Sequence, residues 1–220
     1  MGIISIEHSD RLLWLGRYTE RVYTTMRLFA QTYDAMLDMD VRRYEEFCEK
    51  LDIPNIYDSK YDFCMRYCFD KNDVNSIFSN LIRAYDNAIV LREQLSSETL
   101  SYIQLAIYDM EKASMAKAPL VALQKVIDDV MAFWGMVDDA TYNKNARNII
   151  KTGKHIERLS LYARLHSDPE LIFREIDRLI GRLGRTKLRY EQKSLENILE
   201  FTSQTEVDYG KIIFEVEHLI

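Results

Sequence analysis

Apolar side chains recur at steps of three and four residues along most of the chain. The first such stretch runs through Leu15, Tyr18, Val22, Met26, Phe29, Tyr33 and Met36. This spacing places apolar side chains on one face of an α-helix, so it predicts a long amphipathic helix. Ser9, just before the stretch, is a residue type that caps helix N-termini, and we expect the helix to begin there.

The same periodicity predicts further helices. Their expected spans are 41–51, 76–95, 100–117, 119–133, 139–165 and 169–184, with one or two more within 188–220. Pro119 and Pro169 stand where a first-turn proline opens a helix. We expect short helices and loop between Tyr57 and Asn75. No segment has the period of a strand, and no linker rich in Gly, Pro or Ser divides the chain. The pattern therefore predicts one all-α domain over residues 1–220, a multi-helix bundle.

Composition agrees with long helices and narrows the classes of partner. The 220 residues include only 7 Gly and 3 Pro, and 47% are hydrophobic, as in a folded domain with few turns. The net charge of −6, without a long basic run, argues against binding nucleic acid. Three cysteines suit a reducing compartment, and no apolar run reaches the ~18 residues of a membrane span. We expect a cytoplasmic protein without a membrane segment.

Two of the expected helices share a motif. The segment LGRYTERVYTTMRL from Leu15 aligns with TGKHIERLSLYARL from Thr152, with identical Gly, Glu, two Arg and Leu. Each copy carries a stripe at i, i+4, i+7 and i+11, formed by Gly16, Glu20, Tyr23 and Arg27 in one and by Gly153, Glu157, Ser160 and Arg164 in the other. A glycine inside a helix costs about 1 kcal/mol relative to alanine, so two at matching places need a reason. Close approach of another helix backbone supplies one, and we predict a pseudo-repeat whose helices cross there.

Such a crossing would partly desolvate Glu20 and Glu157. A buried carboxylate without a partner is far costlier than a paired one, so both would need arginines. The candidates are Arg27 and Arg164, or arginines across the contact. Two interpretations stay open at this stage. The charges either form weak exposed pairs, or they make a polar patch for a ligand or for a partner's tail.

Signals for metal or cofactor chemistry are incomplete. A di-iron bundle needs two Glu-x-x-His pairs, and only Glu215 with His218 has that spacing. Cys64 and Cys68 could share a helix face, but further ligands are not evident, so we predict buried structural cysteines. We therefore expect neither a metal nor a cofactor.

Catalytic and phosphate-binding motifs are also missing. His155 and His166 lie in or beside one helix without a nucleophile motif, and a structural role is favoured for both. The run from Gly181 to Arg185 is typical of a helix end rather than a phosphate cradle.

Four segments resemble one family. The run RLLWLGRYTERVYTTMRL (11–28) is similar to the opening of bacterial alpha-E domain proteins, which carry a WLGRYxER signature, and GKHIERLSLYARL (153–165) resembles their second GRxxER element. Between these lie FDKNDVNSIFSNLIRAYDNAIVLREQLSSE (69–98), which resembles the ARENARxxRxQLSxE stretch, and FWGMVDDAT (133–141), which resembles GMTDRT. Order and spacing match over about residues 9–165.

The chain departs from the family pattern in the middle segment and at Arg147. Tyr85 and Ile89 replace arginines, whereas Asn87 and Arg92 are retained, and Arg147 stands where an aromatic residue is usual. The family is typically longer at its C-terminus, so the resemblance describes a shortened and divergent member.

The resemblance implies an all-helical protein encoded beside or fused to a circularly permuted ATP-grasp ligase, in systems suited to amide or peptide bond synthesis. We therefore expect an accessory subunit that binds this ligase and positions its peptide or amino-acid substrate. Its polar binding face would consist of Arg17, Glu20, Arg21, Arg27, Glu157, Arg158 and Arg164, with Asn87 and Arg92 from the middle segment. Arginines suit this role because they bind carboxylates in bidentate fashion.

Two other classes of function stay open. The bundle could be an enzyme in which Glu20 and Glu157 serve as acid and base with separated pKa values at a shared desolvated site. Alternatively, it could be a homo-oligomeric helical scaffold.

Overall fold

A 33-residue helix, α1 (Ile6–Asp38), forms the centre of the molecule. The computed structural model describes residues 4–38, 42–201 and 207–220. Within these ranges the chain forms ten helices and no strand, which confirms the all-α prediction. The others are α2 (Arg43–Leu51), α3 (Lys60–Phe69), α4 (Ile77–Val90), α5 (Ser97–Met115), α6 (Pro119–Ala140), α7 (Lys144–Arg164), α8 (Pro169–Leu183), α9 (Gln192–Phe201) and α10 (Tyr209–Glu217).

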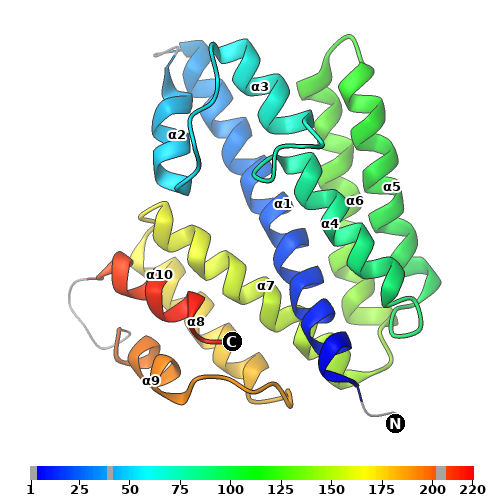
Figure 1. Ribbon diagram of the computed structural model, residues 1–220, viewed down its shortest axis with the longest axis vertical. Helices are drawn as coiled ribbons and strands as arrows, with labels where there is room; N and C mark the ends of the chain where they lie inside the picture. Colours follow the sequence, from blue (N-terminus) through cyan, green and yellow to red (C-terminus); the bar gives the residue numbers. More distant parts are fainter. Residues whose placement is uncertain (1–3, 39–41, 202–206) are drawn as a thin grey trace.

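Two groups of helices pack on opposite sides of α1 (Figure 1). On one side lie α4, which contacts α5, and the antiparallel pair of α5 and α6, of which α6 also contacts α1. On the other side α7 crosses α1 and is covered by α8 and α10, and α9 contacts α10. The short helices α2 and α3 pack near the C-terminal end of α1. Most of the helices thus depend on contacts with α1 or α7, directly or through one neighbour.

Local signals explain many of the helix boundaries. Ser76 and Ser96 accept hydrogen bonds from the backbone N–H three residues on, and so cap α4 and α5. Pro119 and Pro169 occupy the first turn of α6 and α8, as the sequence predicts. The segment 57–75 contains α3, and the tail contains α9 and α10.

Several predicted boundaries are wrong by a few residues. The first helix starts at Ile6, so Ser9 lies inside it rather than at its N-cap. Helix α4 ends at Val90 instead of continuing to residue 95, because the chain turns there. Helix α6 continues to Ala140, and α7 begins only after Asn143, whose side chain caps it. The expected start of the second helix, Val41, lies outside the described residues.

The core near α2 and α3 is aromatic and holds the three thiols. Phe63 packs against the rings of Phe29, Phe47 and Tyr67, which come from α1, α2 and α3. Around this cluster, the described structure buries the chain's free cysteines Cys48, Cys64 and Cys68. Burial raises the pKa of Cys48 and of Cys64 to about 11, and it also raises the pKa of Cys68 well above the ordinary value of a thiol. The predicted burial of Cys64 and Cys68 is confirmed.

Metal-ligand clusters and membrane-spanning helices are both absent from the same ranges. No group of three His, Cys, Asp or Glu side chains within the described residues is arranged to hold a metal ion. None of the described helices combines the length and the apolar character that a bilayer crossing requires.

Candidate functional site: two exchanged Glu-Arg pairs

The crossing of α1 and α7 is built on two glycines. A Cβ atom at Gly16 would lie 2.0 Å from the carbonyl oxygen of Ile150 in α7. Likewise, a Cβ at Gly153 would lie 2.1 Å from the carbonyl oxygen of Leu13 in α1. No side chain fits into either space, so both positions require glycine. The predicted close approach at these residues is confirmed.

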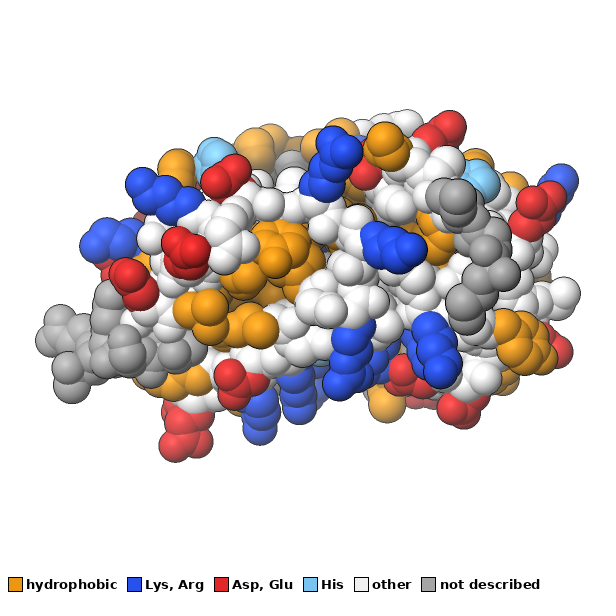
Figure 2. Space-filling model, turned by 90° about the horizontal axis from the view of Figure 1, so that it is seen from below, with side chains coloured by type: hydrophobic (Ala, Val, Ile, Leu, Met, Phe, Trp, Pro, Cys, Tyr) orange, Lys and Arg blue, Asp and Glu red, His pale blue; other side chains and the backbone are white. Residues whose placement is uncertain are grey.

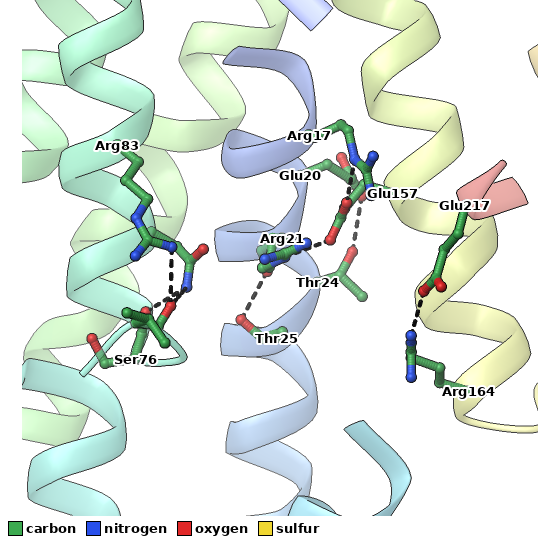
Figure 3. Close-up of polar contacts among 12 residues, drawn as sticks. Arg17, Glu20, Arg21, Thr24, Thr25, Ser76, Arg83, Glu157, Arg164 and Glu217 are labelled. Atoms are coloured by element: carbon green, nitrogen blue, oxygen red, sulfur yellow. Dashed lines mark hydrogen bonds and ion pairs between the residues drawn. The ribbon is translucent and has the colours of Figure 1, made fainter. Parts of the chain in front are cut away.

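One product of this approach is a buried ion-pair cluster around Glu157 of α7. The Nε atoms of Arg17 and Arg21, both in α1, donate to the two oxygens of this carboxylate at 2.9 and 2.5 Å (Figure 3). Glu157 is only 2% exposed. Burial by itself would raise its pKa, but the charges and hydrogen bonds of Arg21 and Arg17 outweigh burial and lower the pKa. Glu157 is therefore a stably ionised group.

Glu20 of α1 lies in a different electrostatic environment. Its Oε1 accepts hydrogen bonds from Arg158 Nε at 2.6 Å and from Thr24 Oγ1 at 2.8 Å. The residue is fully buried, and its Oε2 has no hydrogen-bond partner among the described residues. Burial outweighs the attraction of Arg158, so the pKa of Glu20 is raised. The two glutamates therefore have pKa values shifted in opposite directions.

The pairing is an exchange between two Glu-Arg dipeptides. Arg21, which follows Glu20 in sequence, binds Glu157, and Arg158, which follows Glu157, binds Glu20. The family model that matches residues 8–207 is Alpha-E, described as a predicted alpha-helical domain with a conserved ER motif. The chain belongs to the Alpha-E family. No curated protein and no solved structure matches this chain.

In this Alpha-E chain the ion-pair network continues into α8 through Glu175. Its carboxylate lies 2.8 Å from His155 Nδ1, 2.5 Å from Arg178 Nη1 and 3.6 Å from Arg158 Nη1. Although burial opposes the shift, the hydrogen bond with His155 and the charge of Arg158 lower the pKa of Glu175 to about 2. The repeat gives no signal for Glu175, because the repeated segments end before α8. A carboxylate within an arginine-rich amphipathic helix is the only hint in the sequence.

Two arginines of the sequence-derived stripe lie elsewhere. Arg27 is exposed and lies over the ring of Tyr23, one helical turn before it. Arg164 forms an ion pair with Asp52 and, as Figure 3 shows, another with Glu217. The expectation that Arg27 and Arg164 neutralise the buried glutamates is wrong, whereas its alternative, arginines across the contact, is correct. A side chain seven residues further along the same helix stripe does not have to face the crossing, whereas the side chains of the two glutamates do.

The middle segment contributes no residue to this cluster. The Asn87 side chain donates to the carbonyl of Arg83 in its own helix, α4. Arg92 is exposed in the turn that follows α4. These two predicted binding residues therefore lie apart from the Glu-Arg exchange.

A small cavity of about 160 Å³ opens beside Glu157. Charged side chains of both signs line it, namely Arg17, Arg21, Arg164, Asp52, Glu157 and Glu217. Glu20 is not among its lining residues. The acid–base hypothesis requires Glu20 and Glu157 at one shared site, and this cavity reaches only Glu157, whose two arginines hold it ionised. The arrangement instead suits noncovalent binding of a small charged group.

Proposed function

We propose that this Alpha-E chain is an accessory subunit that binds an ATP-grasp-type ligase and positions a peptide or amino-acid substrate for amide bond formation. Membership of the family supports the proposal, because the resemblance implies this association. The observation that carries the positioning role is the small cavity beside the crossing, with guanidinium groups and carboxylates in one lining.

A lining of both signs suits a zwitterion. The carboxylate of an amino acid would pair with a guanidinium, and its ammonium group with an acidic side chain. Arg17 and Arg21 are paired with the buried Glu157, so their guanidinium groups keep fixed positions in the cavity lining. In contrast, Arg164 pairs with Asp52, whose side chain is 84% exposed, and with the half-exposed Glu217. Exposed pairs contribute little free energy, so Arg164 can exchange these partners for a ligand carboxylate.

Co-expression tests the partnership. The chain is produced together with the circularly permuted ATP-grasp ligase that the resemblance leads us to expect beside it in the genome, and both co-purification and the rate of amide bond formation are measured. We expect the two proteins to co-purify, and we expect omission of this chain to lower the rate. Failure to co-purify together with an unchanged rate would overturn the proposal.

A pair of matched variants tests the cavity within that complex. Arg164→Gln removes the exchangeable guanidinium, and we expect the KM for the amino-acid or peptide substrate to rise about tenfold, the loss of one charged contact. Arg27→Gln removes an exposed arginine that lies outside the cavity and should leave KM within about twofold. Equal KM values for the two variants would show that the cavity does not hold substrate.

A further inference from the structure

A second hollow, about 390 Å³ in volume, lies between α7 and the C-terminal half of α8. Six cationic side chains line it, Lys151, Lys154 and Arg158 from α7 and Arg178, Arg182 and Arg185 from α8 or just beyond its end. The remaining lining residues are His155 and Gly181. Neither a carboxylate nor an apolar side chain belongs to this lining. We call the hollow the α7–α8 groove. Figure 2 views the molecule from below, and several Lys and Arg side chains lie next to one another along the lower edge of this view.

Carboxylates outside the lining neutralise only half of these cations. Lys151 pairs with Asp138, and the buried Glu20 and Glu175 serve Arg158 and Arg178. The other three cations form no ion pair with any carboxylate of the described residues.

The nearest contacts of those three cations are with neutral groups or with solvent. Lys154 Nζ lies 3.9 Å from the centre of the Trp134 ring. Arg182 donates to the neutral side-chain oxygen of Asn148, at 3.1 Å, and Arg185 is exposed. An excess of positive charge is thus concentrated in one groove of a chain whose net charge is −6.

Burial and neighbouring positive charge together disfavour the charged form of one of these cations in the free protein. Burial and the nearby charge of Arg158 lower the pKa of Lys154 to about 8, in spite of the attraction of Glu20. An anion in the groove would relieve the repulsion among the cations and favour the charged form of Lys154.

The spacing of the cations sets the size of that anion. The cations of α7 occupy positions i, i+3 and i+7, and those of α8 and the turn after it occupy i, i+4 and i+7, so each set forms one stripe. Seven residues of α-helix extend about 10 Å, and the two stripes face the same groove over this length. A single carboxylate or phosphate would reach only part of it, whereas two or three linked phosphate groups would cover most of it.

We propose that the α7–α8 groove binds a small ligand that carries two or three linked phosphate groups. Phosphate oxygens are strong acceptors for guanidinium and ammonium donors, and each group brings one to two negative charges in a compact volume. The absence of apolar side chains from the lining disfavours a peptide, whose side chains need apolar surface. The site is separate from the cavity beside Glu157, so it does not depend on the proposed function.

Gly181 provides a test that leaves the fold intact. A Cβ atom at this exposed helical glycine would meet no heavy atom within 4 Å, so a longer side chain can be added without a clash. Gly181→Glu places a carboxylate in the groove, and Gly181→Gln adds nearly the same volume without charge. Gly135 of α6 is also exposed, has the same free space and does not line the groove, so Gly135→Glu controls for the change in net charge.

Isothermal titration calorimetry with sodium tripolyphosphate measures binding to the wild-type chain and to these variants. We expect a Kd of about 100 μM or tighter at physiological salt, and a loss of about tenfold or more for Gly181→Glu. Gly181→Gln and Gly135→Glu should stay within about threefold of wild type. ATP in a parallel titration distinguishes the source of the phosphates, since a nucleotide that binds more tightly than tripolyphosphate would identify the phosphate chain of a nucleotide as the occupant.

Three results would overturn the proposal. The first is no heat of binding with either tripolyphosphate or ATP. The second is an equal Kd for Gly181→Glu and Gly181→Gln, because binding would then occur elsewhere. The third is a tighter Kd for citrate or for a single-stranded oligonucleotide than for either phosphate probe, which would assign the groove to carboxylates or to nucleic acid.

Discussion

Gly16 and Gly153 lie at one crossing, and each faces a backbone carbonyl of the other helix. The contact brings the axes of α1 and α7 close enough for Arg21 and Arg158 to reach the glutamate of the opposite helix. The glycines therefore set the geometry in which the buried charges are neutralised.

Adding a methyl group at the crossing should be strongly destabilising. In Gly16→Ala the new Cβ would lie 2.0 Å from a backbone oxygen, which cannot rotate away as a side chain could. We expect a loss of about 3 kcal/mol or more in the free energy of unfolding, measured by urea denaturation. Gly135→Ala, in open space, should gain about 0.5–1 kcal/mol because alanine favours a helix. Equal stability of the two variants would contradict this close approach of the two backbones.

The two buried glutamates should respond differently to neutralisation. Glu157→Gln removes the charge that two arginines share, and we expect a loss of about 3 kcal/mol at pH 7. Glu20→Gln should cost only about 1 kcal/mol or less, since burial already opposes the charged form of Glu20. Denaturation of both variants and wild type at pH 7 measures the two differences.

The pH dependence of these differences has opposite signs. Glu157 has a lowered pKa, so its stabilising contribution is present above its unfolded pKa of about 4.5 and is lost as the pH falls. Glu20 has a raised pKa, so its contribution is complete below about 4.5 and is lost as the pH rises through the folded pKa. As the pH falls, the free energy of unfolding of Glu157→Gln should therefore approach that of wild type. Over the same range, wild type should become more stable relative to Glu20→Gln. Parallel pH profiles for the two variants would disprove this assignment.

Acid unfolding should depend on Glu175. Its pKa of about 2 lies below the unfolded value of 4.5, so its contribution to stability is present above pH 4.5 and is lost between about pH 4.5 and 2. Glu175→Gln should lower the stability at pH 7 and flatten the profile in that acidic range. Circular dichroism during an acid titration measures both effects, and an unchanged slope in the variant would exclude Glu175 as the cause.

Lys154 should affect stability on the alkaline side. Its pKa of about 8 in the folded protein is below the unfolded value of 10.5, so the unfolded chain binds more protons between these pH values. Stability therefore rises with pH across this window. Lys154→Met lacks the titratable amine. The free energy of unfolding of wild type should therefore increase relative to that of the variant from pH 8 to 10.5. A constant difference would show that Lys154 titrates normally.

Sequence periodicity predicts most of this fold because each long helix buries one face. The glycines of the two matching segments predict the crossing, because glycine inside a helix is costly and is expected where the backbone of a neighbouring helix must approach closely. The positions of Glu20 and Glu157 follow from the same argument, and their burial agrees with it.

Partner choice at the crossing could not be predicted in the same way. Positions along one helix show which residues share a stripe, but they do not show how far the second helix is rotated. For this reason the sequence alone does not separate Arg27 and Arg164 from Arg21 and Arg158 as partners of the glutamates. The α7–α8 groove is likewise invisible in the sequence, because its two stripes belong to helices that face each other only after folding.

Because the three native thiols are buried, a fluorophore can be attached selectively to an introduced cysteine. Cys48, Cys64 and Cys68 are buried, and raised pKa values leave little thiolate at neutral pH. Maleimide dyes should thus react slowly with the folded wild-type chain. A cysteine introduced at the 91% exposed Tyr142, as Tyr142→Cys, would accept a fluorophore without prior removal of native thiols, and docking to other molecules could then be followed by fluorescence anisotropy.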